Sequence, residues 1–197
     1  MRTNTFIVSA ENGLRLTLFY SIQSPFSNFH PCHFLLTEQD VNGVEQTLGF
    51  NCTEQYYMYC KALSCGDMEA AEKIMKEKKA NKIKSIAKAL KNFDTKKEDV
   101  MRRGLWAKYT QNDRLRHDLF YTQGTRLVEC SPTDVYWGIG LDIKNHLALC
   151  PSKWRGKNRL GEILTEIRDQ LVTRPEYEAQ VFQLRTERFV SKKFIQY

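Results

Sequence analysis

A carboxylate and an amine lie two helical turns apart in the segment 51–63. At 3.6 residues per turn, Glu54 and Lys61 point within about 20° of each other. The residues around them are mostly tyrosine, methionine, cysteine, alanine and leucine. A helix that is apolar nearly all round is usually buried, and charged groups are rarely buried without a partner or a task. The pattern predicts a helix that lines the wall of a pocket with a carboxylate and an amine.

A purely structural role for both charges is also open. With Asn51 as the N-cap, Glu54 three residues later would complete a capping box. Lys61 would extend its ammonium to solvent near the end of the helix. Structural groups also occupy such positions, so the rest of the chain must decide between the two interpretations.

Length and composition indicate a single soluble domain. At 197 residues the chain can form one full hydrophobic core, and 42% hydrophobic with 27% charged residues is typical of globular proteins. The first residues lack the apolar core of a signal peptide, and no stretch approaches the ~18 apolar residues that span a bilayer. We therefore expect an intracellular, cytoplasmic protein with no membrane contact.

Cysteine and histidine spacing argues against a metal site. None of the six cysteines forms a Cys-x-x-Cys pair, so we expect free, mostly buried thiols in a reducing compartment. His30, Cys32 and His33 offer three metal-binding side chains, but no second ligand cluster accompanies them. We expect no metal.

The positive charge of the chain is concentrated in one Lys-rich segment, residues 73–97. This segment holds ten lysines against Glu77 and Asp94, a local net charge of +8, so the remainder of the chain carries −1 of the total of +7. Such a patch attracts phosphates, and nucleic acid is the commonest partner of this kind. A solvated helix face is the competing interpretation, because no aromatic residue lies between Lys73 and Lys91 to stack on bases.

Apolar periodicity and turn residues predict a mixture of short strands and helices. Strands are predicted at 4–8, 14–20 and 126–130, with a hairpin over 34–49 around Asn42 and Gly43. Three helices are predicted in the first half of the chain: residues 51–63, residues 68 to about 79 with Asp67 as the cap, and a helix through Ile83 to Leu90. Three more are predicted in the second half: one that begins at Asp99, one from Asn112 or Asp113 to Gly124, and one through Ile163 to Leu171. Residues 141–153 are predicted to form a loop.

Prolines on both sides make residues 24–31 an ordered loop rather than a strand. Phe26 and Phe29 would anchor this loop in the core and hold Asn28 in a fixed direction. The alternative is a turn in which Asn28 bonds its own backbone.

Two later segments are also dense in polar and aromatic residues. Asp134 follows a proline turn, and Trp137 precedes glycines at positions 138 and 140 that let a ligand approach the backbone. The alternative is an Asx-turn aspartate and a core tryptophan. Residues 154–161 combine glycines, cationic side chains and free amides at a helix N-terminus, which suits a phosphate site. The spacing matches neither a Walker loop nor a dinucleotide fingerprint.

Six pieces of the sequence, in this order, resemble the NADAR family, also called the YbiA-like or riboflavin-biosynthesis-intermediate N-glycosidase family. They lie between about residues 19 and 172: Phe26–Phe29, Glu54–Ala62, Val100–Met101, Leu127–Glu129, Asp134–Gly140 and Gly156–Gly161. Each piece alone is weak, but the ordered set is specific. The family usually has a tryptophan shortly before the Val-Met pair, and the segment 92–99 has none, so we expect no ligand contact there.

The resemblance implies an α+β fold dominated by helices, with small N-terminal β-hairpins on a helical core. With no internal repeat or low-complexity linker, we expect one YbiA-like domain over residues 1–174. Residues 175–197 lie outside the resemblance and are expected to form a helical or strand extension of the same domain, with an open role. The resemblance also implies an enzyme, a hydrolase that cleaves N-glycosidic bonds to ribose. Two substrate classes are associated with the family: ADP-ribose attached to guanine in nucleic acid or nucleotides, and phosphoribosylamino-pyrimidine intermediates of riboflavin synthesis.

Site roles follow from this resemblance together with the chemistry of the residues. When a base leaves C1′, the sugar gains oxocarbenium character and the base gains negative charge, so a carboxylate and a donor are needed. We expect Glu54 to act as acid or base, Lys61 to attack C1′ and form a Schiff base, and Asp134 to bind ribose hydroxyls or position the nucleophile. The expected substrate-binding residues are Ser27, Asn28, Phe29, Tyr57, Trp137, Gly138, Arg155, Lys157, Asn158 and Gly161. This chemistry requires no metal or redox cofactor.

Three functions compete. The first is a hydrolase that removes ADP-ribose from guanine, with the Lys-rich segment as a nucleic-acid contact. The second is the riboflavin-intermediate glycosidase, which needs a small closed pocket and gives the lysines no role. The third is a non-catalytic module that binds ADP-ribose or nucleic acid, which does not need a buried amine.

Overall fold

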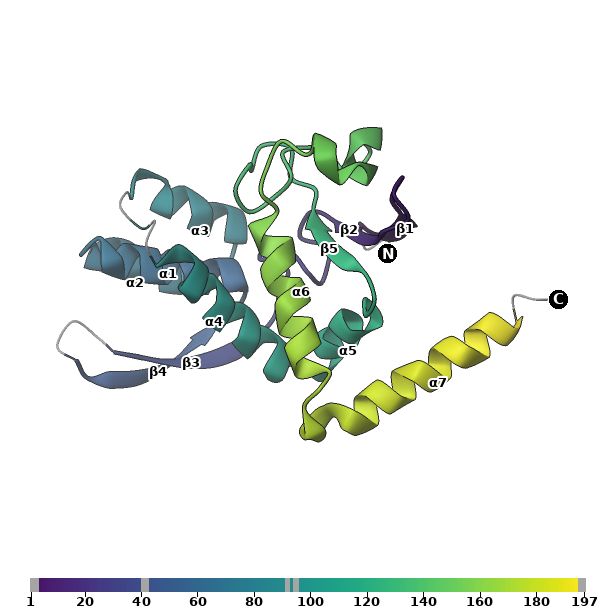
Figure 1. Cartoon of the computed structure of the whole chain (residues 1–197). Coiled ribbons are helices and arrows are strands. Elements are labelled where there is room, and N and C mark those ends of the chain that lie inside the picture. Colours follow the sequence, from purple (N-terminus) through teal and green to yellow (C-terminus); the bar gives the residue numbers. More distant parts are fainter. Residues whose placement is uncertain (1–3, 40–42, 91–92, 94–95, 195–197) are drawn as a thin grey trace. The chain divides into compact units, whose positions relative to one another are not determined.

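Residues 4–39, 43–90, 93 and 96–194 are described by a computed structural model of the chain (Figure 1). They form two compact units. Unit 1 contains the described residues of Met1–Tyr20, Ser24–Phe26 and Arg114–Tyr197, and unit 2 contains those of Ser21–Gln23 and Ser27–Asp113. No helix of the described residues is both long and apolar enough to cross a membrane.

Unit 1 contains a three-stranded sheet in the order β1-β2-β5. Strands β1 (Thr5–Ser9) and β2 (Arg15–Phe19) are antiparallel, and β5 (Arg126–Glu129) lies parallel to β2. The helices of this unit are α5 (Asp113–Tyr121), α6 (Arg159–Leu171) and α7 (Glu178–Phe194), with short 3-10 helices at η2 (His146–Leu149), η3 (Pro151–Lys153) and η4 (Pro175–Tyr177). Helix α6 packs on β5 through an apolar stripe with the i, i+3, i+4 spacing of an amphipathic helix.

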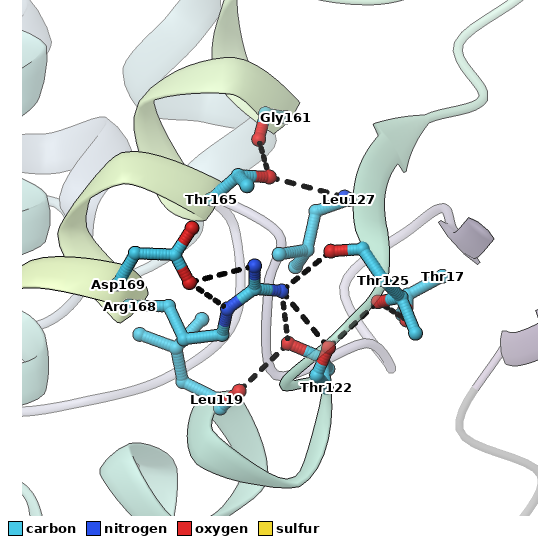
Figure 2. Close-up of polar contacts among 9 residues, drawn as sticks. All are labelled: Thr17, Leu119, Thr122, Thr125, Leu127, Gly161, Thr165, Arg168 and Asp169. Atoms are coloured by element: carbon cyan, nitrogen blue, oxygen red, sulfur yellow. Dashed lines mark hydrogen bonds and ion pairs between the residues drawn. The ribbon is translucent and has the colours of Figure 1, made fainter. Parts of the chain in front are cut away.

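Buried polar bonds hold α6 against the turn that leads into β5 (Figure 2). Arg168 is 3% exposed, and its Nη1 donates to the carbonyls of Thr122 at 2.9 Å and Thr125 at 2.6 Å. The same guanidinium pairs with Asp169 at 2.8 Å, so the buried charge is satisfied. Thr165 Oγ1 accepts the amide of Leu127 at 3.1 Å. These bonds fix the strand from which the 131–140 loop starts.

Unit 2 consists of a hairpin and a group of helices. The hairpin pairs β3 (Phe34–Gln39) with β4 (Glu45–Phe50), and the helices are α1 (Thr53–Ser64), α2 (Met68–Lys76), α3 (Ala80–Ile86), the 3-10 helix η1 (Ala87–Ala89) and α4 (Lys97–Thr110). Helix α1 contacts each of the other helices of this unit.

An aromatic cluster and one glycine explain how α1 is buried in unit 2. The Tyr56 ring packs edge-on against Phe50 and Phe34, with centroids 5.1 and 6.4 Å away. Helix α4 approaches the same ring at Gly104, where a Cβ atom would lie 2.6 Å from the Tyr56 side chain. Only glycine allows this close helix–helix packing.

Most of the predicted elements are confirmed, including the three strands, the hairpin and the α+β class dominated by helices. The predicted helix over 68 to about 79 is shorter, because it ends at Lys76 and α3 begins at Ala80. Residues 141–153 contain two 3-10 helices, and the tail after Pro175 is helical. The predicted turn residue Asn42 lies outside the described residues, as do positions 91, 92, 94 and 95 of the Lys-rich segment.

Neither Asn51, the cap of the structural alternative for α1, nor Asp99 is a helix N-cap. The N-cap of α1 is Cys52, and the amide of Asn51 donates at 2.8 Å to the side chain of Gln55, not of Glu54. The capping box that would have given Glu54 a structural role therefore does not form. Helix α4 begins after Lys96, which places Asp99 inside its first turn.

Candidate functional site

The predicted site residues fall into two sets, one in each unit. The α1 set of unit 2 comprises Ser27, Asn28, Phe29, Glu54, Tyr57 and Lys61. The loop set of unit 1 comprises Asp134, Trp137, Gly138, Arg155, Lys157, Asn158 and Gly161.

The loop at Ser27–Phe29 is bonded to the first turn of α1. The amide of Glu54 donates to the carbonyl of Asn28 at 2.9 Å, which satisfies one of the N-terminal amides that a helix leaves without an internal partner. Ser27 Oγ accepts the amide of Phe29 at 3.1 Å. The Glu54 and Asn28 side chains are 4% and 6% exposed. The sequence therefore places a buried carboxylate and a buried amide next to each other at the start of one helix.

Two buried oxygen atoms make this end of α1 a candidate ligand site. Asn28 Oδ1 and Thr53 Oγ1 are buried and have no hydrogen-bond partner among the residues that the structure describes. A buried polar atom without a partner costs about 1–3 kcal/mol. Such atoms need an explanation, and a substrate that donates a hydrogen bond here provides one.

Lys61 lies on the same stripe of α1 as Glu54 and Tyr57, about 10 Å along the axis from the carboxylate. Its Nζ donates to the carbonyl of Ala87 at 3.1 Å, and the side chain is half-buried. The ammonium therefore does not extend freely into solvent, as the structural interpretation required. Tyr57 is 8% exposed and packs edge-on against Phe93 with ring centroids 5.2 Å apart.

Lys108 is a residue of this region that sequence reasoning missed. It lies on α4, is 0% exposed, and its Nζ donates to the carbonyl of Ser27 at 3.0 Å. Burial lowers the pKa of this ammonium. A signal was present in the sequence, because Lys108 falls three residues after Leu105 and seven after Met101, on the buried stripe of its helix.

In the loop set, two segments are joined through their backbones. The amides of all six residues from Arg155 to Leu160 donate to carbonyls of residues 135–139, at 2.9–3.1 Å. The prediction of free amides that bind phosphate at this helix N-terminus is therefore wrong. The positive charge in this segment is carried by the side chains of Arg155 and Lys157, which are exposed. Lys157 Nζ lies 5.2 Å from the centroid of the Tyr136 ring.

Asn158 and Gly161 serve the packing of β5. Asn158 is 0% exposed, its Oδ1 accepts the amide of Glu129 at 2.9 Å, and its Nδ2 donates to the carbonyl of Leu127 at 2.9 Å. A Cβ atom at Gly161 would lie 2.2 Å from the same Leu127 oxygen. Both residues thus have a structural role in the packing against β5. Glu129, which the predicted site left out, adds a carboxyl side chain that is 8% exposed.

Gly156 provides a stability test of the joined segments. A Cβ atom there would lie 2.3 Å from the carbonyl oxygen of Gly138 and 2.8 Å from Val135 Cα. We expect Gly156→Ala to lower the free energy of unfolding by about 3 kcal/mol, because backbone atoms must move to admit the methyl group. Urea unfolding measures this loss. The matched control is Gly13→Ala, where φ is +80° but the space is open, and we expect a loss of about 1 kcal/mol. Equal losses in the two variants would contradict the packing argument.

Asp134 forms the Asx-turn that was the structural alternative for it. Its Oδ1 accepts the amides of Tyr136 at 3.0 Å and Trp137 at 2.7 Å, which leaves Oδ2 outside the turn. Trp137 is only half-buried and packs edge-on against Tyr136 with centroids 5.1 Å apart, so it is not a core tryptophan. The turn presents one carboxylate oxygen and a partly exposed indole.

The cysteines and histidines contribute no metal site to the part of the chain that the structure describes: no group of three His, Cys, Asp or Glu side chains is placed to hold an ion. His30 Nδ1 instead bonds the carbonyl of Ile22 at 2.9 Å. The six cysteines are free thiols, of which two are buried, three are half-buried and one is exposed. Burial raises the pKa of Cys52 to about 11 and of Cys130 to about 12.

The fold and the α1 set define an α+β protein in which one helix carries a buried carboxylate and a half-buried amine beside an ordered loop. The family model of the NADAR domain matches residues 18–172, so the chain belongs to the NADAR domain family. This confirms the resemblance that the six sequence pieces indicated.

Three relatives support the same assignment. Protein irg-1 of Caenorhabditis elegans is 40% identical over 199 residues, covering 95% of this chain and 93% of that protein. N-glycosidase R617 of Acanthamoeba polyphaga mimivirus is 37% identical over 150 residues, covering 74% and 86%. N-glycosidase YbiA of Escherichia coli is 42% identical over 81 residues, covering 41% and 44%. The NMR structure of YbiA superposes with a TM-score of 0.61 at 28% identity, over 87% of this chain and 90% of that one, which confirms the α+β fold.

Proposed function

We propose that this protein is an N-glycosidase that removes ADP-ribose from ADP-ribosylated guanine in nucleic acid or nucleotides. At the level of enzyme class it is a hydrolase of N-glycosyl bonds, in agreement with the names of its relatives R617 and YbiA. The observation that carries the finer proposal is the α1 set, in which Glu54 and Lys61 share one helix face beside the buried Asn28.

Glu54 is suited to the acid or base role. Cleavage of the bond between C1′ and the guanine nitrogen leaves positive charge on the sugar and negative charge on the base. A carboxylate in a site that excludes water stabilises the first more strongly than it would in solution, and it can relay the proton that the base takes up. Asn28, whose Oδ1 is buried and without a partner, orients a ribose hydroxyl by accepting a hydrogen bond from it.

Lys61 is suited to nucleophilic attack. In its neutral form the amine forms a bond to C1′ as the bond to guanine breaks, and opening of the sugar ring gives a Schiff base that water then hydrolyses. The hydrogen bond to Ala87 holds the side chain of Lys61 in one direction. Direct attack by a water that Glu54 activates is the competing route.

In unit 1, Asp134, Trp137, Arg155 and Lys157 are proposed as candidate contacts for ribose, base and phosphate groups. The Oδ2 atom of Asp134 would accept from ribose hydroxyls, the indole would pack on base or sugar, and the two cations would meet phosphate. Arg155 and Lys157 are exposed, and Asp134 and Trp137 are partly exposed.

Charge next to the α1 set favours a polymeric substrate. On α2, Lys73 and Lys76 pair with Glu69 and Glu72 at 2.6 and 3.2 Å, whereas α3 contains lysines and no acidic residue. Lys84 of α3 lies 5.4 Å from the centroid of the Phe29 ring, in the same loop as Asn28. We propose that this lysine-bearing face of unit 2 contacts the phosphates of a nucleic-acid strand.

An assay on defined substrates tests the proposal. The purified protein is incubated with an oligonucleotide that carries ADP-ribose on one guanine, and we expect free ADP-ribose and the unmodified strand. A second reaction contains the phosphoribosylamino-pyrimidine intermediates of riboflavin synthesis. Release of ribose 5-phosphate there, with no cleavage of the oligonucleotide, would assign the second function. Saturable binding without turnover on any ribosylated base would overturn the enzymatic proposal.

A further inference from the structure

Lys108 is an unusual residue because its charged group is entirely removed from solvent. It is 0% exposed, and no carboxylate among the described residues pairs with it. Its side chain lies instead among a backbone carbonyl, the Tyr109 ring at 5.2 Å from Nζ, and the thiols of Cys32 and Cys52. An amine in such surroundings is costly to bury. A structural role alone is served as well by a leucine or methionine, so the amine calls for a further explanation.

The acceptor of this amine lies in the loop that carries Asn28. The Ser27 carbonyl accepts both Lys108 Nζ at 3.0 Å and the amide of His30 at 3.2 Å. The next carbonyl, that of Asn28, accepts the amide of Glu54 at 2.9 Å. One side chain of α4 is thus connected, through two consecutive carbonyls, to the first turn of α1.

We propose that Lys108 is a positioning residue that fixes the Ser27–Phe29 loop and, through it, the directions of Asn28 and Glu54. The inference rests on the proposed function in so far as these two residues act on the substrate. Lys108 itself takes no part in the chemistry, because its Nζ is directed to the Ser27 carbonyl and has no path to a bound sugar through solvent. Lys108 lies 44 residues beyond Ser64, the last residue of the helix that it serves, which explains why motif reasoning passed over it.

Lys108→Met separates positioning from folding. Methionine keeps the length and apolar body of the side chain and removes the charge, and the Ser27 carbonyl retains the His30 amide as a donor. The variant should therefore fold, because no buried acceptor is left unpaired. The matched control is Lys153→Met, which makes the same chemical change at an exposed lysine of η3.

Two readouts distinguish the possible results. Hydrogen exchange at the Glu54 amide should be about 10-fold faster in Lys108→Met, while the Ala71 amide, which donates to Asp67 on α2, should be unchanged. In turnover of the ADP-ribosylated oligonucleotide we expect kcat to fall about 10- to 100-fold with little change in KM, because misplaced groups bind substrate but do not reach the transition state. Lys153→Met should match the wild type in both measurements.

If hydrogen exchange at the Glu54 amide is unchanged in Lys108→Met, the inference is overturned whatever the activity of the variant. A wild-type kcat in Lys108→Met also overturns it. Faster exchange in a protein whose wild type cleaves no ribosylated base overturns the proposed function and supports the positioning role. If Lys108→Met does not fold, Lys108→Arg keeps a cationic donor on the same side chain. It should then show exchange at Glu54 within 3-fold of the wild type, and a 10-fold increase despite the retained donor would overturn the inference.

Discussion

Glu54→Gln is expected to lower kcat for release of ADP-ribose by at least about 100-fold, which is the usual contribution of a positioned acid or base. Glutamine has the same shape but cannot carry or accept the proton. The backbone bond from residue 54 to the Asn28 carbonyl does not depend on the side chain, so the start of α1 should be preserved. Steady-state rates on the ADP-ribosylated oligonucleotide measure the effect.

The control for this variant is Glu45→Gln, which makes the same change at an exposed position of β4. It should cleave at the wild-type rate. Circular dichroism and thermal unfolding of both variants check that neither change disturbs the fold. If Glu54→Gln cleaves as fast as the wild type, the carboxylate has no part in the reaction and the proposed assignment of acid or base fails.

Lys61→Met is expected to abolish covalent trapping of the sugar. If the amine forms a Schiff base during turnover, borohydride reduces it to a stable secondary amine, and mass spectrometry locates the added mass on the peptide with Lys61. We expect the adduct only in the wild type, together with a loss of kcat of about 100-fold or more in the variant.

Lys61→Arg is the matched variant for this experiment. Arginine keeps the positive charge and can still donate to the Ala87 carbonyl, but it cannot form a Schiff base. Loss of activity in both variants supports nucleophilic attack. Full activity in Lys61→Arg, or a wild-type lysine that stays unmodified during turnover, would contradict it and favour attack by activated water.

Local sequence patterns predicted the helices and strands well, because each helix or strand depends mainly on residues close to it in the sequence. The period-2 strands and the aromatic-rich helix around Tyr56 are confirmed. The boundaries were less accurate where two capping solutions competed, as at the start of α1, where Gln55 rather than Glu54 bonds Asn51. Which of the two side chains bonds Asn51 depends on how each is buried in the folded protein. A few neighbouring residues of the sequence do not reveal that burial.

The candidate site could be predicted only in part for a similar reason. Residue types and spacing select Glu54 and Lys61 as candidates, because a charge on an apolar helix is visible in the sequence, and their roles stay predictions. They could not show that the amides of residues 155–160 donate to carbonyls of 135–139, since that arrangement joins segments about twenty residues apart. For the same reason the sequence could not show that both polar atoms of the Asn158 side chain bond to β5.

The parallel pairing of β2 with β5 has a consequence for biosynthesis. Leu16 is in register with Arg126, so the ribosome must add about a hundred residues between the two partners. At roughly 5–20 residues per second this takes roughly 5–20 s, during which one edge of β2 has no native neighbour in the nascent chain. Most of unit 2 is one continuous stretch, 27–113, and it is synthesised within this interval. An uncovered strand edge is a template for pairing with other chains, so a chaperone that shields the first twenty residues would raise the yield of native protein.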